Sequence, residues 1–456
     1  MITPLLTRES CRSYIEERLF EPVTYSDEIL GQTGRIGIEL EIFSCQTDKN
    51  SKKGVKPIPL FGKEGSLINA LLSASKSFGG IAKVWNPDNR IKGYPAQVEQ
   101  IKFPDGDSFL FEPGGQIEIS TALCNNMQEL QAHLTSKQEI LKIVTQNSGF
   151  HFAQFGTNPW FDVNEIKNQL HKPRYHALEK YFDNIGQYGK QMMLQTGSLH
   201  INLDLGHDPA TRVKRIVAAN LLVPFVTAMF ANSSIVEGKK SGYKSYRSFI
   251  WQQLDARRTG ILAMDKISKT MDKDDLIDVY LEFALKAPLI YIDELGDCEL
   301  PDYFTLEYWI ANPIQGIKPD SSHLANHFSL LFPEVRLKGY LEIRSVDAPP
   351  VNWQWVPVMF YTGLLYSNTS LEQVLELLLP FSSCINEFHR EATYGLLSDE
   401  IFDISKKLMT LAIDGFSGLP DDFKKEQHVS ELIRFFDKYT NQRRTFADDN
   451  PEQFLL

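Results

Sequence analysis

The sequence predicts an α+β fold built on a mainly antiparallel sheet. Strand-like alternation of apolar and polar residues is concentrated in four segments, at residues 35–43, 109–120, 192–205 and 336–346. Helical segments and long loops separate these strands, without the regular strand–helix–strand rhythm of a doubly wound parallel sheet. The last hundred residues show helical periodicity almost throughout. We therefore expect helices to surround the sheet.

The length and composition of the chain fit one large globular domain. The 456 residues are 43% apolar and 23% charged, which excludes a disordered chain. No clear linker or repeat divides them, so we expect a single domain over residues 1–456, with the sheet and its site at 35–347 and a supporting helical layer at 350–456. The 47 Lys+Arg and 58 Asp+Glu give a net charge of −11. This balance argues against a nucleic acid or an anionic membrane as partner, since both bind a basic face.

The cysteine pattern and the N-terminus predict a soluble, cytoplasmic protein. Five cysteines, at positions 11, 45, 124, 298 and 384, form no C-x-x-C pair, which is typical of reduced thiols. The first twenty residues carry charges where a signal peptide has an apolar core. The longest apolar run, residues 216–231, is shorter than the roughly 20 residues that a membrane span needs and contains Asn220 and Pro224.

The first predicted strand places two carboxylates on one face. Successive side chains of a strand point to opposite faces. Glu39 and Glu41 of the segment 37–42 therefore share one face, while its Ile and Leu residues share the other.

The second strand, at residues 116–120, repeats this pattern. Its polar face carries Gln116, Glu118 and Ser120. Glu112 comes just before it, across a Pro-Gly-Gly sequence.

The third and fourth strands complete a set with similar polar faces. In the third strand the polar positions are Ser198, His200, Asn202 and Asp204. In the fourth they are Lys338, Tyr340, Glu342 and Arg344.

Helical periodicity is clearest at residues 126–146, which begin at an Asn and end before a Gly, as helix caps predict. Similar patterns lie at 173–182, 213–231 and 274–287.

The polar faces of the four strands together indicate a metal-dependent site. Any one of them is typical of an antiparallel strand with one wet face. Taken together they carry five Glu and one His with few Lys. Neighbouring carboxylates would repel and raise each other's pKa unless cations lay between them. Oxygen-rich ligands favour Mg²⁺ or Mn²⁺ over Zn²⁺, and several such ions with Arg nearby are typical of sites that hold nucleotide phosphates.

Other motifs in the sequence give weaker evidence for function. The segment 238–242 is a poor imitation of the phosphate-binding loop G-x-x-x-x-G-K-[ST], and we expect a loop there that could contact substrate. His323 and His327 have the spacing of a helical metal pair but lack the Glu of H-E-x-x-H. We expect core or capping roles for both.

Several separated blocks of the sequence resemble the glutamate–cysteine ligases, especially the branch of plants and many bacteria. These blocks are GIELE at 37–41, FEPGGQIEIS at 111–120, RY…MM…T…HINLD at 174–204, NSS…EGK…SYR…W…D…RTG at 232–260 and FPEVRLK…YLEIR at 332–344. The resemblance implies a catalytic domain like glutamine synthetase, with a curved antiparallel sheet of about six strands and helices outside it. It also implies the reaction: ATP phosphorylates the γ-carboxylate of L-glutamate, and L-cysteine displaces phosphate to give γ-glutamylcysteine and ADP. That reaction is the first step of glutathione-type thiol biosynthesis.

The resemblance also implies roles for individual residues. The implied ligands of Mg²⁺ (or Mn²⁺) are Glu39, Glu41, Glu112, Glu118, His200 and Glu342. Catalytic roles fall to Arg344, Arg247 and Arg258, with Arg344 facing the transferred phosphoryl group. Implied substrate contacts are Gln116, Thr196, Asn202, Trp251 and Lys338. The expected partners are small molecules (ATP, glutamate and cysteine), and the expected assembly is a monomer or a homodimer.

Two departures from the family pattern leave the acceptor amine open. His200 stands where many members have Gln, and RSVD at 344–347 stands where R-G-A-D is usual. One alternative is a related ligase that joins glutamate to a different amine. The other is a catalytically silent regulatory relative, which would show damaged metal ligands, and the sequence shows none.

Overall fold

The computed structural model describes residues 5–21, 34–47, 54–87, 93–296, 300–301 and 303–449. Within them, ten strands form the main sheet in the order β13-β14-β8-β1-β6-β5-β4-β3, and β2 and β7 also pair with β1. Their bounds are β1 Ile36–Thr47, β2 Gly54–Lys56, β3 Ile81–Trp85, β4 Gln97–Lys102, β5 Ser108–Phe111, β6 Ile117–Ser120, β7 Phe150–Ala153, β8 Ser198–Leu203, β13 Val335–Leu337 and β14 Leu341–Asp347. Four short strands lie outside this sheet: β9 Ile235–Val236, β10 Lys239–Lys240, β11 Thr259–Gly260 and β12 Phe332–Pro333.

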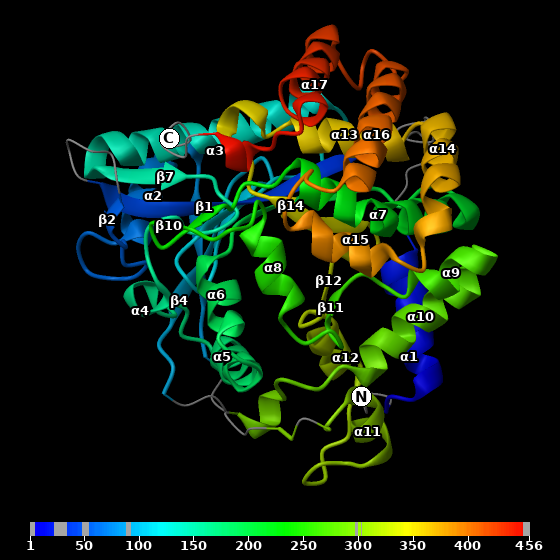
Figure 1. The fold of residues 1–456 in the computed structure, drawn as a ribbon. Helices are drawn as coiled ribbons and strands as arrows, with labels where there is room; N and C mark the ends of the chain where they lie inside the picture. Colours follow the sequence, from blue (N-terminus) through cyan, green and yellow to red (C-terminus); the bar gives the residue numbers. More distant parts are fainter. Residues whose placement is uncertain are drawn as a thin grey trace.

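Helices cover both sides of this sheet (Figure 1). On the chain before β13 they are α1 Arg8–Tyr14, α2 Leu67–Ser75, α3 Met127–Ser148, α4 Val163–Ile166, α5 Pro173–Ile185, α6 Tyr188–Gln195, α7 Pro209–Met229, α8 Tyr246–Gln252, α9 Met264–Thr270, α10 Lys273–Lys286, α11 Leu306–Ala311 and α12 Ser321–Phe328. After β14 they are α13 Val356–Leu365, α14 Asn368–Leu378, α15 Ile385–Ala392, α16 Asp399–Ser417 and α17 Glu426–Lys438. None of the helices in the described ranges has the length and apolar character that crossing a membrane requires.

The predicted α+β class is confirmed. Each strand pair of the main sheet is antiparallel, and the parallel pair β11–β12 lies outside it. The sheet has ten strands where the family resemblance implied about six. The long β1 accounts for part of this difference, because β2 and β7 pair with its C-terminal end beyond the strands that carry the predicted polar faces.

Three of the four predicted strand segments have different bounds from those expected. Residues 109–120 form the two strands β5 and β6, because the chain reverses at Gly115, which has φ +83°. Residues 336–346 likewise form the hairpin β13–β14, which turns at Gly339 with φ +73°. Residues 192–195 complete helix α6, and β8 begins only at Ser198.

The apolar face of the sheet packs on helix α7, which is buried along most of its length. Ile38, Leu40 and Ile42 of β1 have no exposed surface. They share one buried core with α7, whose side chains are almost all buried from Val213 to its end. Figure 1 shows the C-terminal helices α13–α16 beside α7. Residues 350–449 are predominantly helical, as the periodicity predicted, while a single domain over residues 1–456 remains a prediction.

A different set of helices lies on the other face of the sheet. Figure 1 shows α5, α6, α8 and α12 on the opposite side of the strands from α13–α17. Helix α5 begins at Pro173, where the fixed φ of proline suits the first helical position. Lys172, just before it, forms an ion pair of 2.7 Å with Glu99 of β4, which ties the start of α5 to the sheet.

Candidate functional site

A pocket of about 220 Å³ lies on the polar face of the sheet. The strands and adjoining turns contribute Glu39, Glu41, Glu112, Pro113, Gln116, Glu118, Thr196, His200, Arg336, Lys338, Glu342 and Arg344. The helices and the segment after α12 contribute Arg174, Tyr175, Leu178, Met192, Met193, Trp251, Ser329 and Phe332.

The strand register explains why the acidic residues meet. Residues directly opposite one another in an antiparallel pair lie on the same face of the sheet. Glu39 of β1 pairs with His200 of β8, and Glu41 pairs with Glu118 of β6. The two-residue period of each strand therefore brings side chains from distant parts of the sequence together.

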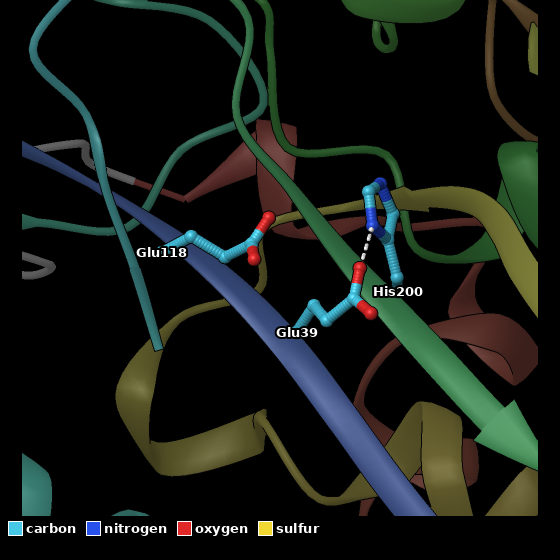
Figure 2. Close-up of side chains that lie close together, drawn as sticks. All are labelled: Glu39, Glu118 and His200. Carbon is cyan, nitrogen blue, oxygen red and sulfur yellow. Dashed lines mark hydrogen bonds and ion pairs between the residues drawn. The ribbon is translucent and has the colours of Figure 1, made fainter. Parts of the chain in front are cut away.

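The carboxylates form two groups that share one member. Glu39, Glu118 and His200 each offer a ligand atom within 4.8 Å of the others, and so do Glu41, Glu112 and Glu118. Figure 2 shows the carboxylates of Glu39 and Glu118 near the imidazole of His200. Glu118 thus belongs to both groups, as a carboxylate bridging two cations would. Carboxylate oxygens at such spacing suit Mg²⁺ or Mn²⁺.

A hydrogen-bond chain connects the two groups. Nδ1 of His200 lies 3.0 Å from Oε2 of Glu39, and Nε2 lies 2.8 Å from Oγ of Ser198. Ser198 donates its hydroxyl proton to Oε2 of Glu41 at 2.8 Å. One imidazole and one hydroxyl thus connect Glu39 of one carboxylate group with Glu41 of the other.

Ionisation of two of the carboxylates is unfavourable in the folded protein. Burial, with the nearby charge of Glu41, raises the pKa of Glu112 to about 7. Burial, with the charge of Glu39, raises the pKa of Glu118 well above its ordinary value. Burial also opposes ionisation of Glu39, but the hydrogen bond and charge of His200 bring the pKa of Glu39 below its usual range. A divalent cation among these groups would relieve the repulsion, so the residues present fit such an ion.

Glu342 has a different environment from the other four Glu residues. Its fully buried carboxylate lies 3.2 Å from Arg336, 2.5 Å from Lys338 and 2.8 Å from Arg344. Although burial opposes ionisation, these three cations hold the pKa of Glu342 well below its usual range. Glu342 lies in neither carboxylate group, so the structure places this predicted metal ligand among cations instead.

Arg344 lies at a bulge in the sheet. The register between β14 and β8 shifts between Ile343 and Val346, and a bulge of this kind changes the direction of side chains. The Arg344 guanidinium lies 5.8 Å from the ring centre of Trp251 and 5.9 Å from that of Phe332. Such contacts between a cation and aromatic rings hold the guanidinium in place on the pocket wall.

Three predicted site residues do not line the pocket. Arg247 donates to the backbone oxygen of Arg344 at 2.6 Å. Arg258 has no exposed surface and donates to the backbone oxygens of Leu330 and Pro288. Asn202 donates to Oε1 of Glu39 at 3.3 Å. Each of these residues donates to another part of the protein, although Nε of Arg247 and Nε of Arg258 are buried without a hydrogen-bond partner.

The remaining predicted substrate contacts line the pocket, and two of them hold unused polar atoms. Gln116 donates to the backbone oxygen of Thr196 at 2.9 Å, while its buried Oε1 has no hydrogen-bond partner. Nε1 of Trp251 is also buried without a partner. A buried polar atom without a partner costs free energy, which a ligand could recover.

Sequence reasoning missed several residues of the wall. Arg336 lies two positions before Lys338, so extending the strand alternation by one step would have found it. Arg174 and Tyr175 lie at the start of helix α5, where no strand period could place them. The apolar part of the wall was also missed; it consists of Leu178, Met192, Met193 and Phe332.

Among the weaker motifs, the two histidines take the capping and core roles expected of them, whereas the substrate contact expected at residues 238–242 is not found in the pocket lining. His323 belongs to the N-terminal cap of α12, and buried His327 donates to the backbone oxygen of Ala284 at 2.7 Å. The segment 238–242 contains part of the short β9–β10 hairpin and does not line the pocket.

Comparisons with known proteins agree with the blocks in the sequence. The model of "Glutamate-cysteine ligase family 2 (GCS2)" matches residues 87–437, which is most of the chain. The chain is 32% identical over 273 residues to the chloroplastic glutamate–cysteine ligase of Nicotiana tabacum, covering 59% of this chain and 51% of the relative. It is 31% identical over 320 residues to that of Arabidopsis thaliana, covering 66% and 59%. The chain thus spans about half the length of the curated relatives it matches.

One solved structure that aligns with the chain is a bifunctional glutathione synthetase from Pasteurella multocida. It aligns with 90% of this chain and 53% of its own, at a TM-score of 0.36 and 13% identity.

The comparisons also correct one prediction. A cytoplasmic location was expected from the sequence, and it is contradicted by the relatives, which are chloroplastic by name. The family resemblance itself is confirmed: this chain belongs to glutamate–cysteine ligase family 2.

Proposed function

We propose that the protein is an ATP-dependent ligase that joins L-glutamate to L-cysteine. ATP phosphorylates the γ-carboxylate of glutamate, the amine of cysteine attacks the resulting acyl phosphate, and γ-glutamylcysteine, ADP and phosphate leave. The observation that carries this proposal is the charge arrangement of the pocket. Two carboxylate groups that share Glu118 lie in the same pocket as three cations bound to Glu342.

The two carboxylate groups are the proposed metal sites. Glu39, Glu118 and His200 would hold one Mg²⁺ or Mn²⁺ ion, and Glu41, Glu112 and Glu118 another. Such ions, when bound, neutralise charge on nucleotide phosphates. The support is the raised pKa of Glu112 and Glu118, since carboxylates that repel one another gain from a shared cation.

The cations opposite these groups are proposed to stabilise the phosphoryl group in transfer. Arg344 is the residue for which the case is strongest, because its guanidinium is planar and can form paired hydrogen bonds with phosphate oxygens. Glu342 and the rings of Trp251 and Phe332 fix its position before substrate arrives. A charged group fixed in advance needs little reorganisation during the reaction.

The apolar wall is proposed to protect the acyl phosphate. Leu178, Met192, Met193 and Phe332 line the pocket together with the charged residues. An acyl phosphate is hydrolysed when water reaches it, and excluding water from the closed site prevents that loss. The same wall can contact a small, weakly polar side chain such as that of cysteine.

The products test this proposal. ADP release should require both amino acids and a divalent cation, and the product should have the mass of γ-glutamylcysteine. With ¹⁸O in the γ-carboxylate of glutamate, one labelled oxygen should appear in phosphate. AMP and pyrophosphate on a nucleotide chromatogram, or phosphate without label, would contradict the acyl-phosphate route.

A further inference from the structure

Asp347 is a buried carboxylate that does not line the pocket and that binds another segment of the chain. It ends strand β14, three residues after Arg344. Oδ2 accepts from Oγ of Ser233 at 2.6 Å, and Oδ1 accepts from Oγ of Ser245 at 3.0 Å. Oδ2 also accepts from the backbone N–H of Asn232 at 2.8 Å. Burying a carboxylate is unfavourable, and these hydrogen bonds offset part of that penalty.

The neighbouring chain leaves room for this carboxylate. A Cβ at position 156 would lie 2.5 Å from Cγ of Asp347, closer than such atoms approach in proteins, so only Gly156 fits there. Gly156 is itself fixed, because it donates to the backbone oxygen of Asn232 at 3.0 Å and accepts from the backbone N–H of Gly197 at 3.0 Å. Several distant segments therefore meet at Asp347.

Two serines connect Asp347 to the start of helix α8. Ser245 is the N-cap residue of α8, and its Oγ accepts from the backbone N–H of Ser248 at 3.2 Å. Oγ of Ser233 accepts from the backbone N–H of Arg247 at 3.1 Å. Each hydroxyl thus receives a helix N–H and donates its own proton to Asp347. The first N–H groups of a helix have no partner inside the helix, so these contacts fix the position of α8 relative to the end of β14.

Helix α8 in turn contacts both the main chain and the side chain of Arg344. Residues four apart lie on the same face of a helix, as Arg247 and Trp251 do. Arg247 donates to the backbone oxygen of Arg344 at 2.6 Å, and the ring centre of Trp251 lies 5.8 Å from its guanidinium. The strand register shifts at this point, between Ile343 and Val346. A bulge interrupts the hydrogen bonds of the ladder, so the place of Arg344 depends on α8.

We propose that Asp347 is a positioning residue that holds Arg344 in place for phosphoryl transfer through helix α8. The inference rests on the proposed function, in which Arg344 faces the transferred phosphoryl group. Glu342 fixes the guanidinium from the strand, at 2.8 Å, while Asp347 fixes the helix that contacts it from the other direction. A displacement of about 1 Å in a catalytic group can lower a rate about 100-fold.

The main variant is Asp347→Asn, which keeps the shape of the side chain but turns one acceptor oxygen into an N–H donor. Ser245→Ala removes one of the two serine links and keeps the carboxylate. The control is Asp107→Asn, at another buried carboxylate of the sheet region, which accepts from the backbone N–H of Ala122 at 2.8 Å and does not line the pocket. For each variant, alone and combined with Arg344→Lys, we measure Tm, kcat and the KM for ATP, glutamate and cysteine.

The expected result is a loss of kcat that depends on Arg344. Asp347→Asn should lower kcat about 10- to 100-fold, with each KM within about threefold of the wild type. Ser245→Ala should lower kcat by a smaller factor. In the Arg344→Lys background, Asp347→Asn should lower kcat less than about threefold, because the group that it positions is already lost. Asp107→Asn should lower Tm and leave kcat unchanged.

A second measurement reports the surroundings of Arg344 without turnover. In protein labelled with ¹⁵N-arginine, the side-chain signal of Arg344 is the one that is missing in Arg344→Lys. This signal should shift in Asp347→Asn and stay in place in Asp107→Asn. If Asp347→Asn does not fold, Ser245→Ala serves for both measurements, because it weakens the same connection.

Three results would overturn the inference. The first is a lower Tm with kcat unchanged in Asp347→Asn, as a merely structural role predicts. The second is an equal fall in kcat in both backgrounds. The third is an Arg344 signal that does not move in Asp347→Asn. A wild type that releases no ADP would overturn the proposed function instead, and the NMR comparison would still decide whether Asp347 positions Arg344.

Discussion

Glu112→Gln should make the metal-free protein more stable at pH 8 and leave its stability nearly unchanged at pH 4. The pKa of Glu112 rises from an ordinary value of 4.5 to about 7 in the folded chain. Between these two values the folded state binds more protons than the unfolded state, so the free energy of unfolding falls as pH rises. Below both values the carboxyl is neutral in the folded and the unfolded state, so it does not change the free energy of unfolding. Above pH 7 the carboxylate is ionised in both states and lowers the free energy of unfolding by the full amount, and replacing it with glutamine removes this destabilisation.

The size of this effect follows from the shift. One pKa unit corresponds to about 1.4 kcal/mol, so the shift of Glu112 from 4.5 to about 7 costs on the order of 3 kcal/mol at most. The side chain is partly exposed, and solvent screening reduces the cost. We therefore expect a gain of about 1–3 kcal/mol for Glu112→Gln at pH 8.

Urea denaturation in the presence of EDTA, followed by tryptophan fluorescence from pH 4 to 8.5, measures this gain. Glu376→Gln, at an exposed position of α14, is the matched control and should follow the wild type at every pH. Saturating Mg²⁺ or Mn²⁺ should stabilise the wild type more than Glu112→Gln, because the ion binds the carboxylate that the variant lacks. Equal pH profiles for the variant and the wild type, or a variant less stable at pH 8, would refute the reasoning.

Three further predictions concern activity. Glu342→Gln should lower ADP release on the order of 100-fold while circular dichroism shows a folded protein, because Arg336, Lys338 and Arg344 lose their common partner; full turnover would contradict the assignment. Arg344→Lys keeps the charge but loses the planar fork, so kcat should fall about 10- to 100-fold, and an unchanged kcat would remove Arg344 from the phosphoryl site. Among acceptors, cysteine should have the highest kcat/KM and 2-aminobutyrate should be the best substitute, with discrimination of roughly 10–200-fold. A bulkier or cationic amine that exceeds cysteine tenfold would favour a ligase for a different amine.

The acidic face was predictable because it depends on a local rule. The two-residue period placed Glu39 and Glu41 together without any knowledge of neighbouring strands. The register then brought Glu118 and His200 beside them. The sequence also contained the reason why Glu342 differs, since Arg344 lies two positions after it on the same strand.

The parts that could not be predicted depend on contacts between distant segments. Arg247 and Arg258 have the charge expected of substrate contacts, yet their guanidinium groups bind backbone oxygens. Charge alone does not show whether a buried Arg faces a ligand or the chain. Arg174 reaches the pocket from a helix on another wall, and strand periodicity says nothing about such a residue. The hairpin between β5 and β6 was missed because the reversal at Gly115 leaves the alternation on either side intact.

The order of the strands gives the pocket a charge gradient that no single strand contains. From β13 and β14 come Arg336 and Arg344, which Glu342 holds together. β8 and β1 follow with His200 and Glu39, which share a hydrogen bond. At β6 lies Glu118, which has no ion pair in the described chain and a raised pKa. Cations bound to the protein thus lie at one end and carboxylates that lack cations lie at the other. A phosphate chain that carries its own divalent ions would suit both ends of the pocket. Its metal ions would neutralise the carboxylates, and its oxygens would bind the guanidinium groups.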